Sequence, residues 1–245
     1  MLASAAWLHA LDLRRAERVV EVPGGAAVLS SAFPAAHDHG MLSVLADVDG
    51  ALLASAADDV LGGAGLGHRL VELRTPDAPA AEAGLLAAGY ARDGVVLMEW
   101  GGPSAAPRST ATVVELSVDQ RVAAATEDWR RQLPDADPDV WRQLGERATT
   151  VLPAARTTFL GVLDDDGRVL SRTDLYEHGD RAQVEQVVTL PEARGRGLAS
   201  LLVLEAVRRA GDRTVLLVAD ADDWPRHLYA RLGFRDVALL ASFTR

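Results

Sequence analysis

The segment LPEARGRGLASLLV, residues Leu190–Val203, joins three different compositions in direct succession. An apolar run, Gln186–Leu190, leads into it, and two arginines alternate with two glycines at Arg194–Gly197. The residues that follow, Leu198–Val203, are almost wholly apolar, and Gly211 can end the helix that they begin. The segment therefore predicts a strand, a short glycine–arginine loop and a helix, in that order.

The predicted loop has the features of an anion-binding site. Gly195 and Gly197 lack a Cβ atom, so their backbone can come close to a ligand. The first N–H groups of a helix have no partner within it, and with the helix dipole they attract phosphates. Arg194 and Arg196 add positive charge beside them. These features indicate a pyrophosphate-binding loop, although a strand-to-helix turn that merely needs glycines fits the motif alone equally well.

A dinucleotide-binding fingerprint is a second interpretation of the same residues. The pattern Gly195-x-Gly197-x-x-Ser200 partly matches it, and Asp220 stands where the acidic residue of that motif is expected. The position of the motif argues against this interpretation. A doubly wound domain opens with the fingerprint, whereas here only two predicted strands follow it.

Composition excludes several classes of protein. With 49% hydrophobic and 24% charged residues in 245, the chain is typical of a globular protein. The absence of cysteine excludes disulfides, thiolate metal sites and a cysteine nucleophile. A formal net charge of −10 offers no basic field for nucleic acid, so we expect no nucleic-acid partner.

The apolar segments are too short or too charged to span a membrane, and we expect no membrane partner. Residues 1–17 begin without the basic start of a signal peptide, and Asp12 and Arg15 fall at helical spacing within them. We interpret this stretch as an amphipathic helix and expect a cytoplasmic protein.

The chain divides at Gly101–Ala111, a stretch rich in glycine, proline, serine and alanine. We predict a first domain at 1–102, a linker at 103–111 and a second domain at 112–245. Helical periodicity predicts seven helices: Ala3–Glu17, Ala51–Leu61, Ala80–Ala88, Val118–Leu133, Pro138–Val151, Leu198–Ala210 and Pro225–Leu232. Strands are predicted between them, among them a hairpin with its turn at Asp166-Gly167 and a strand at Gln183–Leu190.

Two stretches of the chain are similar to each other. GLLAAGYARDGVVLMEW, Gly84–Trp100, and HLYARLGFRDVALLASF, His227–Phe243, both predict a helix, a turn with glycine and an aromatic residue, and a strand. We interpret the similarity as the duplication of a fold unit. A chance match of two common helix–turn–strand units is the alternative.

At this point the residues resemble a known family. VVTLPEARGRGLASLLVLEAVRRA followed by LYARLGF is similar to the GNAT-type N-acetyltransferases. Their acetyl-CoA loop has the pattern Gln/Arg-x-x-Gly-x-Gly/Ala, which Arg194, Gly197 and Ala199 match, and their late LYxxLGF element is Leu228–Phe234. The resemblance covers residues 112–245, whereas the first domain is a degenerate copy without the glycine–arginine loop.

The resemblance implies a fold class and a cofactor. The fold would be α/β, a GNAT fold with a splayed mixed β-sheet flanked by helices, in two tandem GNAT-like domains. Acetyl-CoA would enter the split, with its pantetheine arm paired to the strand Val187–Thr189 as an added strand. The expected cofactor-binding residues are Val187, Val188, Thr189, Arg194, Gly195, Arg196, Gly197, Leu198, Ala199 and Ser200.

The resemblance also implies a reaction, the direct transfer of an acetyl group from acetyl-CoA to a primary amine. In the family, a tyrosine at the position of Tyr229 protonates the leaving thiolate; an ordinary packing tyrosine is the alternative. Glu185 is the candidate base, or else a strand carboxylate paired with Arg172 or Arg181. Asp222 replaces the asparagine that many relatives have before the tyrosine.

We expect no metal. The His37–His39 stretch, HDH, lacks the further ligands that a metal site needs, and a polar turn fits it better. The expected partners are acetyl-CoA and an amine acceptor, bound by a monomer or homodimer. A non-catalytic acyl-CoA-binding sensor or scaffold with the same fold is the alternative function.

Overall fold

The structure is a computed structural model that describes residues 2–102, 106 and 108–245. Of the predicted linker, residues 103–105 and 107 lie outside the described residues. The chain forms two compact units, and each unit is made of more than one segment of the sequence. The first unit comprises residues up to 97 together with 220–222 and 237–245, and the second comprises 98–219 and 223–236. The predicted assignment of a degenerate and a catalytic domain stays a prediction.

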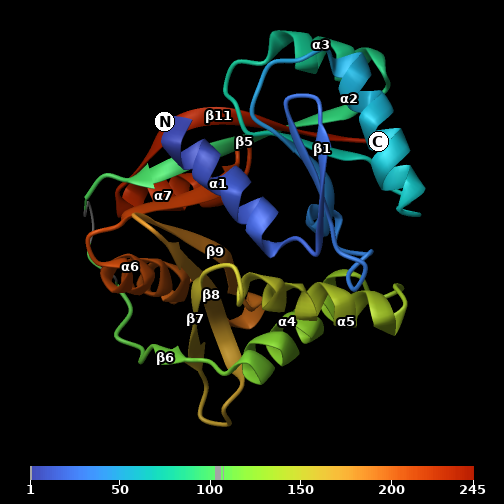
Figure 1. Cartoon of the computed structure of the whole chain (residues 1–245). Coiled ribbons are helices and arrows are strands. Elements are labelled where there is room, and N and C mark those ends of the chain that lie inside the picture. The colour runs from blue at the N-terminus through green and yellow to red at the C-terminus, as the bar shows by residue number, and fades with distance from the viewer. Residues whose placement is uncertain (1, 103–105, 107) are drawn as a thin grey trace. The chain divides into compact units, whose positions relative to one another are not determined.

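The first unit is built around a mixed sheet. Its strand order is β1-β2-β3-β4-β11-β5, so the last strand of the chain lies between two strands of the N-terminal half. Figure 1 shows β11, in red, beside the green strand β5. β3 and β4 run parallel, and β11 pairs with β4 in antiparallel register. The elements are α1 (Leu2–Arg15), β1 (Arg18–Val22), β2 (Gly25–Leu29), β3 (Gly40–Val44), α2 (Gly50–Ala57), a π-helical turn (Asp58–Gly62), β4 (Leu70–Leu73), α3 (Pro79–Ala87), β5 (Ala91–Trp100) and β11 (Phe234–Thr244).

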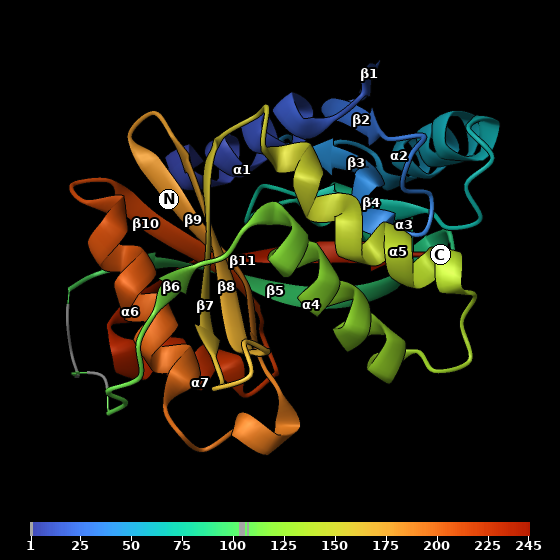
Figure 2. The ribbon, with the colours of Figure 1, turned by 90° about the horizontal axis from the view of Figure 1, so that it is seen from below.

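The second unit has the strand order β10-β9-β8-β7-β6. Figure 2 shows α4 and α5 on one face of β7, β8 and β9, and α6 on the other. Only β9 and β10 run parallel to each other in this set. The elements are β6 (Val114–Glu115), α4 (Val118–Gln132), α5 (Pro138–Glu146), a 3-10 turn (Arg147–Val151), β7 (Arg156–Leu163), β8 (Val169–His178), β9 (Arg181–Thr189), α6 (Leu198–Ala210), β10 (Thr214–Asp220) and α7 (Pro225–Leu232).

The predicted mixed α/β fold is confirmed, and local chemistry explains where its helices begin and end. α4 begins at a capping box, in which Gln120 N donates to Ser117 Oγ at 3.1 Å and Ser117 N donates to Gln120 Oε1 at 2.9 Å. α5 ends earlier than predicted, because its last turn tightens to a 3-10 helix at Arg147–Val151. Among the described residues, no helix is long and apolar enough to cross a membrane.

The internal similarity corresponds to a structural similarity. α3 and α7 each end at a glycine with positive φ, +83° at Gly89 and +121° at Gly233. The aromatic residue that follows is buried in both copies, with Tyr90 4% and Phe234 2% exposed. Each copy then continues as a long strand, β5 or β11. The repeated sequence therefore encodes the same helix–turn–strand unit twice.

A buried ion pair holds the helices of the second unit against its sheet. Arg121 on α4 and Asp174 on β8 are 1% and 0% exposed, and Arg121 Nη2 donates to Asp174 Oδ2 at 2.8 Å. Arg121 Nε donates to the same carboxylate, and Nη1 donates to the carbonyl of Gly145 on α5 at 3.3 Å. Tyr176 adds a third donor to Asp174 at 3.0 Å. One guanidinium thus ties α4, α5 and β8 together.

We predict that Arg121→Met destabilises the protein by about 3–5 kcal/mol, because it leaves the Asp174 carboxylate buried without its cation. The double variant Arg121→Met/Asp174→Asn should recover much of this loss, since the amide oxygen can still accept from Tyr176. Arg130→Met is the matched control on the same helix, where an exposed pair with Glu127 contributes at most about 1 kcal/mol. Denaturant unfolding measures all three, and equal losses for Arg121 and Arg130 would contradict the prediction.

Candidate functional site

A split opens between two parallel strands of the second unit. β9 and β10 pair at their first residues, from Thr214 with Arg181 to Leu216 with Gln183, and the paired register ends there. Both strands continue beyond this point, β9 to Thr189 and β10 to Asp220. The backbone of β9 after Gln183 therefore turns an edge toward the split, where it can pair with a ligand as it would with a strand.

A bulge in β9 lies beside the split. The register with β8 shifts between Arg172, which pairs with Val188, and Asp174, which pairs with Glu185. Gln186 takes a φ of +53°, which is unusual for a residue other than glycine and costs about 1–3 kcal/mol. The extra residue bends the strand and changes the direction of its backbone groups at this point.

The glycine–arginine loop leaves the N-terminus of α6 open. Gly195 and Gly197 have φ values of +76° and +74°, and a Cβ on Gly195 would meet nothing within 4 Å. Gly197 is the N-cap of α6, and no side chain caps the helix. The first N–H groups of α6, from Leu198 onward, thus lack a capping side chain, and Arg108 and Ser109 lie near Gly197, where a Cβ would meet Ser109 N at 3.5 Å. Both glycines adopt a left-handed backbone conformation, which a residue without a Cβ tolerates.

The two arginines of the loop differ in their contacts. Arg194 Nε donates to the carbonyl of Thr189 at 3.3 Å, which connects the loop to the end of β9. Arg196 is exposed. Within the part of the chain that the structure describes, neither arginine forms an ion pair with a carboxylate, although most arginines of this acidic protein do. Two uncompensated positive charges therefore flank the open end of α6.

Tyr229 and Glu185, the two predicted catalytic residues, influence each other electrostatically. Tyr229 lies on α7, is 8% exposed and packs edge-to-face on Phe234, with ring centroids 6.2 Å apart. Burial raises the pKa of Tyr229 to about 12, and the nearby carboxylates of Glu185 and Asp223 add to the rise. Its hydroxyl therefore keeps its proton at neutral pH, as a proton donor must.

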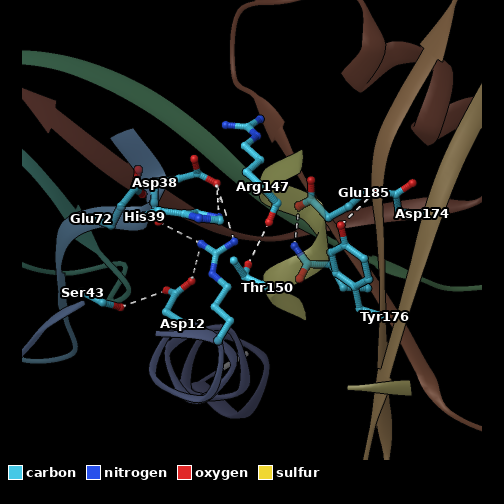
Figure 3. Close-up of polar contacts among 12 residues, drawn as sticks. Asp12, Asp38, His39, Ser43, Glu72, Arg147, Thr150, Asp174, Tyr176 and Glu185 are labelled. Atoms are coloured by element: carbon cyan, nitrogen blue, oxygen red, sulfur yellow. Dashed lines mark hydrogen bonds and ion pairs between the residues drawn. The ribbon is translucent and has the colours of Figure 1, made fainter. Parts of the chain in front are cut away.

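Glu185 lies on β9 directly before the bulge. Its Oε1 accepts a hydrogen bond from Gln183 Nε2 at 2.5 Å, and its backbone carbonyl accepts one from Thr173 Oγ1 at 2.9 Å. Arg172, which sequence reasoning offered as its ionic partner, instead donates to Asp128 at 3.3 Å. Figure 3 shows the side chains of Glu185 and Tyr176 next to each other, with the Tyr176 hydroxyl bonded to Asp174.

Sequence reasoning missed the buried network behind Glu185. Arg172, Asp174 and Tyr176 alternate along β8, so they share one face, and their cross-strand neighbours Val188, Glu185 and Gln183 share it with them. The alternation of polar residues in a predicted strand is a usable signal. Their partners on α4, however, lie far away in the sequence and carry no motif.

The corresponding part of the first unit is closed. β3 and β4 stay paired from Met41 with Leu70 to Val44 with Leu73, which is the full length of β4 and reaches the last residue of β3. The helix that follows, α2, is capped by Asp49, whose carboxylate accepts from Ala51 N at 2.8 Å. A negative side chain therefore occupies the place that an anion would take.

Several polar residues of the first unit form a hydrogen-bonded cluster around Asp12. Asp12 accepts from Ser43 at 3.1 Å, from Arg15 at 3.1 Å and from Arg74 at 3.0 Å, and Figure 3 shows Asp12 and Ser43 facing each other. His37 of the HDH turn stacks on His68, with ring centroids 3.9 Å apart. Within the described residues, no group of three metal-ligating side chains comes together.

Comparison with known proteins finds one family match and several solved structures with a similar fold. Residues 122–234 match the model of the acetyltransferase (GNAT) family, and no curated protein matches the chain. Among solved structures, a functionally unknown conserved protein from Staphylococcus epidermidis ATCC 12228 is 11% identical, with a TM-score of 0.72 and coverage of 94% of each chain. A GCN5-related N-acetyltransferase from Kribbella flavida is 18% identical, with a TM-score of 0.65 and coverage of 99% of this chain and 94% of that one.

A tandem GNAT protein from the clavulanic acid biosynthesis pathway, solved without AcCoA, is 20% identical. Its TM-score is 0.55, and the match covers 80% of this chain and 68% of that one. Structural similarity at 20% sequence identity or less shows the fold alone. As a statement about the fold, the predicted tandem GNAT arrangement is confirmed. Residues 122–234, which hold the split, the bulge and the glycine–arginine loop, match the acetyltransferase (GNAT) family.

Proposed function

We propose that this protein transfers the acetyl group of acetyl-CoA directly to the primary amine of an acceptor. The observation that carries the proposal is the split between β9 and β10, which ends at the uncapped N-terminus of α6. The match of residues 122–234 to the acetyltransferase (GNAT) family supports acyl transfer in general. That the acyl donor is acetyl-CoA, that the acceptor is an amine and that the protein is a cytoplasmic monomer or homodimer are parts of the proposal.

The residues around the split fit acetyl-CoA. The backbone groups of Val187 and Thr189 lie on β9 beyond its last pair with β10, where a pantetheine arm can hydrogen-bond to them. The N–H groups of residues 195–200, with open space at Gly195, suit the pyrophosphate, and Arg194 and Arg196 add charge attraction.

The reaction needs one proton acceptor and one proton donor. The amine nitrogen attacks the thioester carbonyl carbon, a C–N bond forms, and the C–S bond breaks as the thiolate leaves. Glu185 takes the proton that the amine loses, and Tyr229 gives a proton to the thiolate. The raised pKa of Tyr229, about 12, keeps the phenol protonated until that step.

The first unit binds no acetyl-CoA in this proposal. Its parallel strands β3 and β4 remain paired along their length, and Asp49 caps the helix that would otherwise meet a pyrophosphate. One molecule of CoA per chain is therefore the expected stoichiometry. A sensor or scaffold would show the same binding without turnover, so kinetics separates that alternative.

We predict that Gly197→Glu eliminates CoA binding while the protein stays folded. The new carboxylate lies at the N-terminus of α6 and repels the pyrophosphate, and a Cβ there would meet Ser109 N at 3.5 Å, an ordinary contact. Gly179→Glu is the matched control, since it brings the same side chain to a glycine with φ of +60° in the turn before β9. Calorimetry with CoA measures both variants. Wild-type affinity for CoA in a folded Gly197→Glu protein would overturn the assignment of the site.

We predict that Tyr229→Phe lowers kcat about 10²- to 10⁴-fold with little change in CoA affinity, because it removes the proton donor and keeps the ring. The defect should shrink as the pH approaches the thiol pKa of about 8.5, where the thiolate leaves unaided. Below pH 10 the wild-type enzyme should show no loss of activity from ionisation of Tyr229, because the pKa of this residue is about 12.

Tyr90→Phe is the control for this variant, since it removes another buried hydroxyl, in the first unit. Steady-state kinetics across pH, with melting temperatures for both variants, gives the comparison. A folded Tyr229→Phe enzyme with undiminished turnover at neutral pH would leave Tyr229 as a packing residue.

A further inference from the structure

Arg172 on β8 is a buried cation whose hydrogen-bonding capacity is only partly used. The side chain is 3% exposed, yet within the described residues it makes two long hydrogen bonds: Nη2 to Asp128 Oδ2 at 3.3 Å and Nη1 to the carbonyl of Gln186 at 3.5 Å. A guanidinium has five N–H donors, and typical N–H···O distances are about 2.9–3.0 Å. Arg121, by contrast, binds the Asp174 carboxylate with two of its nitrogens.

Arg172 also lines a cavity. The cavity has room for about one water molecule, opens to solvent, and lies between α4 and the ends of β8 and β9. Asp128 and Arg172 are its charged walls, and Ala124, Val188 and Leu190 are among its apolar ones. A buried cation with unused donors at the wall of a cavity is poorly compensated, because burial removes water from its charge. Burial and the neighbouring Arg121 accordingly lower the pKa of Arg172 to about 10, which still leaves it charged at neutral pH.

The cavity and Glu185 belong to the same face of the sheet. Arg172 and Asp174 are two positions apart on β8, about 7 Å along the strand, and Glu185 is the cross-strand neighbour of Asp174. Arg172 also donates to the carbonyl of Gln186, the bulged residue directly after Glu185. Arg172 and Glu185 therefore lie on the same face of the sheet, on adjacent strands and one cross-strand position apart.

We propose that a carboxylate group of the acceptor binds at the mouth of this cavity with one oxygen in the water-sized space beside Arg172, so that the acceptor is an amino acid or a similar compound with a carboxylate close to its reactive amine. The proposal rests on the proposed function and names the substrate class of that site. The planar donors of Arg172 match a carboxylate. Asp128 shares the cavity, and its charge disfavours a dianion such as a phosphate monoester more than a singly charged carboxylate.

Matched acceptors test the proposal on the wild-type protein. Phenylalanine, phenylalanine amide and phenethylamine share one side chain, and only the first has a carboxylate; leucine, leucine amide and isoamylamine form a second set. With acetyl-CoA, we expect kcat/KM to be about 10- to 100-fold higher for the carboxylated member of at least one set. Equal or lower values for the carboxylated members of both sets would overturn the proposal.

Two variants test whether the preference for carboxylated acceptors arises at the cavity beside Arg172. Arg172→Gln removes the charge, and Ala124→Leu fills the cavity without altering any charge. Both should abolish the preference for the carboxylate while retaining transfer to phenethylamine. Arg156→Gln is the control, since this arginine on β7 is exposed and pairs with Glu177 outside the cavity. If Arg172→Gln lowered kcat/KM equally for all acceptors while Ala124→Leu changed nothing, Arg172 would be a structural residue and the proposal would fail.

A binding measurement tests the carboxylate site independently of whether the protein transfers an acetyl group. Calorimetry with 3-phenylpropanoate and with its amide, each in the presence of CoA, needs no turnover. We expect the acid to bind about 10- to 100-fold more tightly than the amide, and Arg172→Gln to remove the difference. Tight CoA binding without transfer to any amine would refute the proposed reaction alone, whereas failure of the acid to bind better than the amide would refute the carboxylate site.

Discussion

The candidate site depends on one constraint, the early end of pairing between β9 and β10. Two parallel strands that stayed paired would leave no backbone edge for a ligand, because every N–H and C=O group between them would be used. The register stops at Gln183 and Leu216, and the bulge at Gln186 bends β9 beyond that point. The loop that follows then brings the open end of α6 to the same split. The backbone of β9, the helix N-terminus and Glu185 thus become available together.

The two units contain the same series of helices and strands, but their central parallel strands differ in how far they stay paired. In both, a parallel pair of strands is joined by a helix, and a helix, a glycine–aromatic turn and a long strand follow. In the first unit β3 and β4 stay paired to their last residues, and Asp49 caps α2, the helix between them. The side chains of Ser43 and Arg74 donate hydrogen bonds to Asp12. The first unit has no alternating arginines and glycines before α2, and that helix has an acidic cap where α6 has none.

Two buried arginines on the same face of the sheet have different environments. Arg121 is matched by Asp174 and contributes to the position of α4 and α5. Arg172 reaches its carboxylate only loosely and borders a cavity. A buried cation is stable only where partners replace its water, and the long contacts of Arg172 at the wall of a cavity are the basis of the proposed carboxylate site.

The sequence by itself determined the elements and the loop chemistry. Apolar periodicity places α6 and α7 at the bounds that the structure has, and glycine is the residue whose backbone tolerates the positive φ of residues 195 and 197. These are local properties, and short-range sequence carries them. Only the tertiary structure decided that β11 joins the first unit and that β9 parts from β10. It also decided that Arg121, Asp128 and Arg172 meet beside Glu185. Strand neighbours and buried ion pairs join residues far apart in the chain, and the packing of the whole unit selects among many possible partners, which no local pattern can specify.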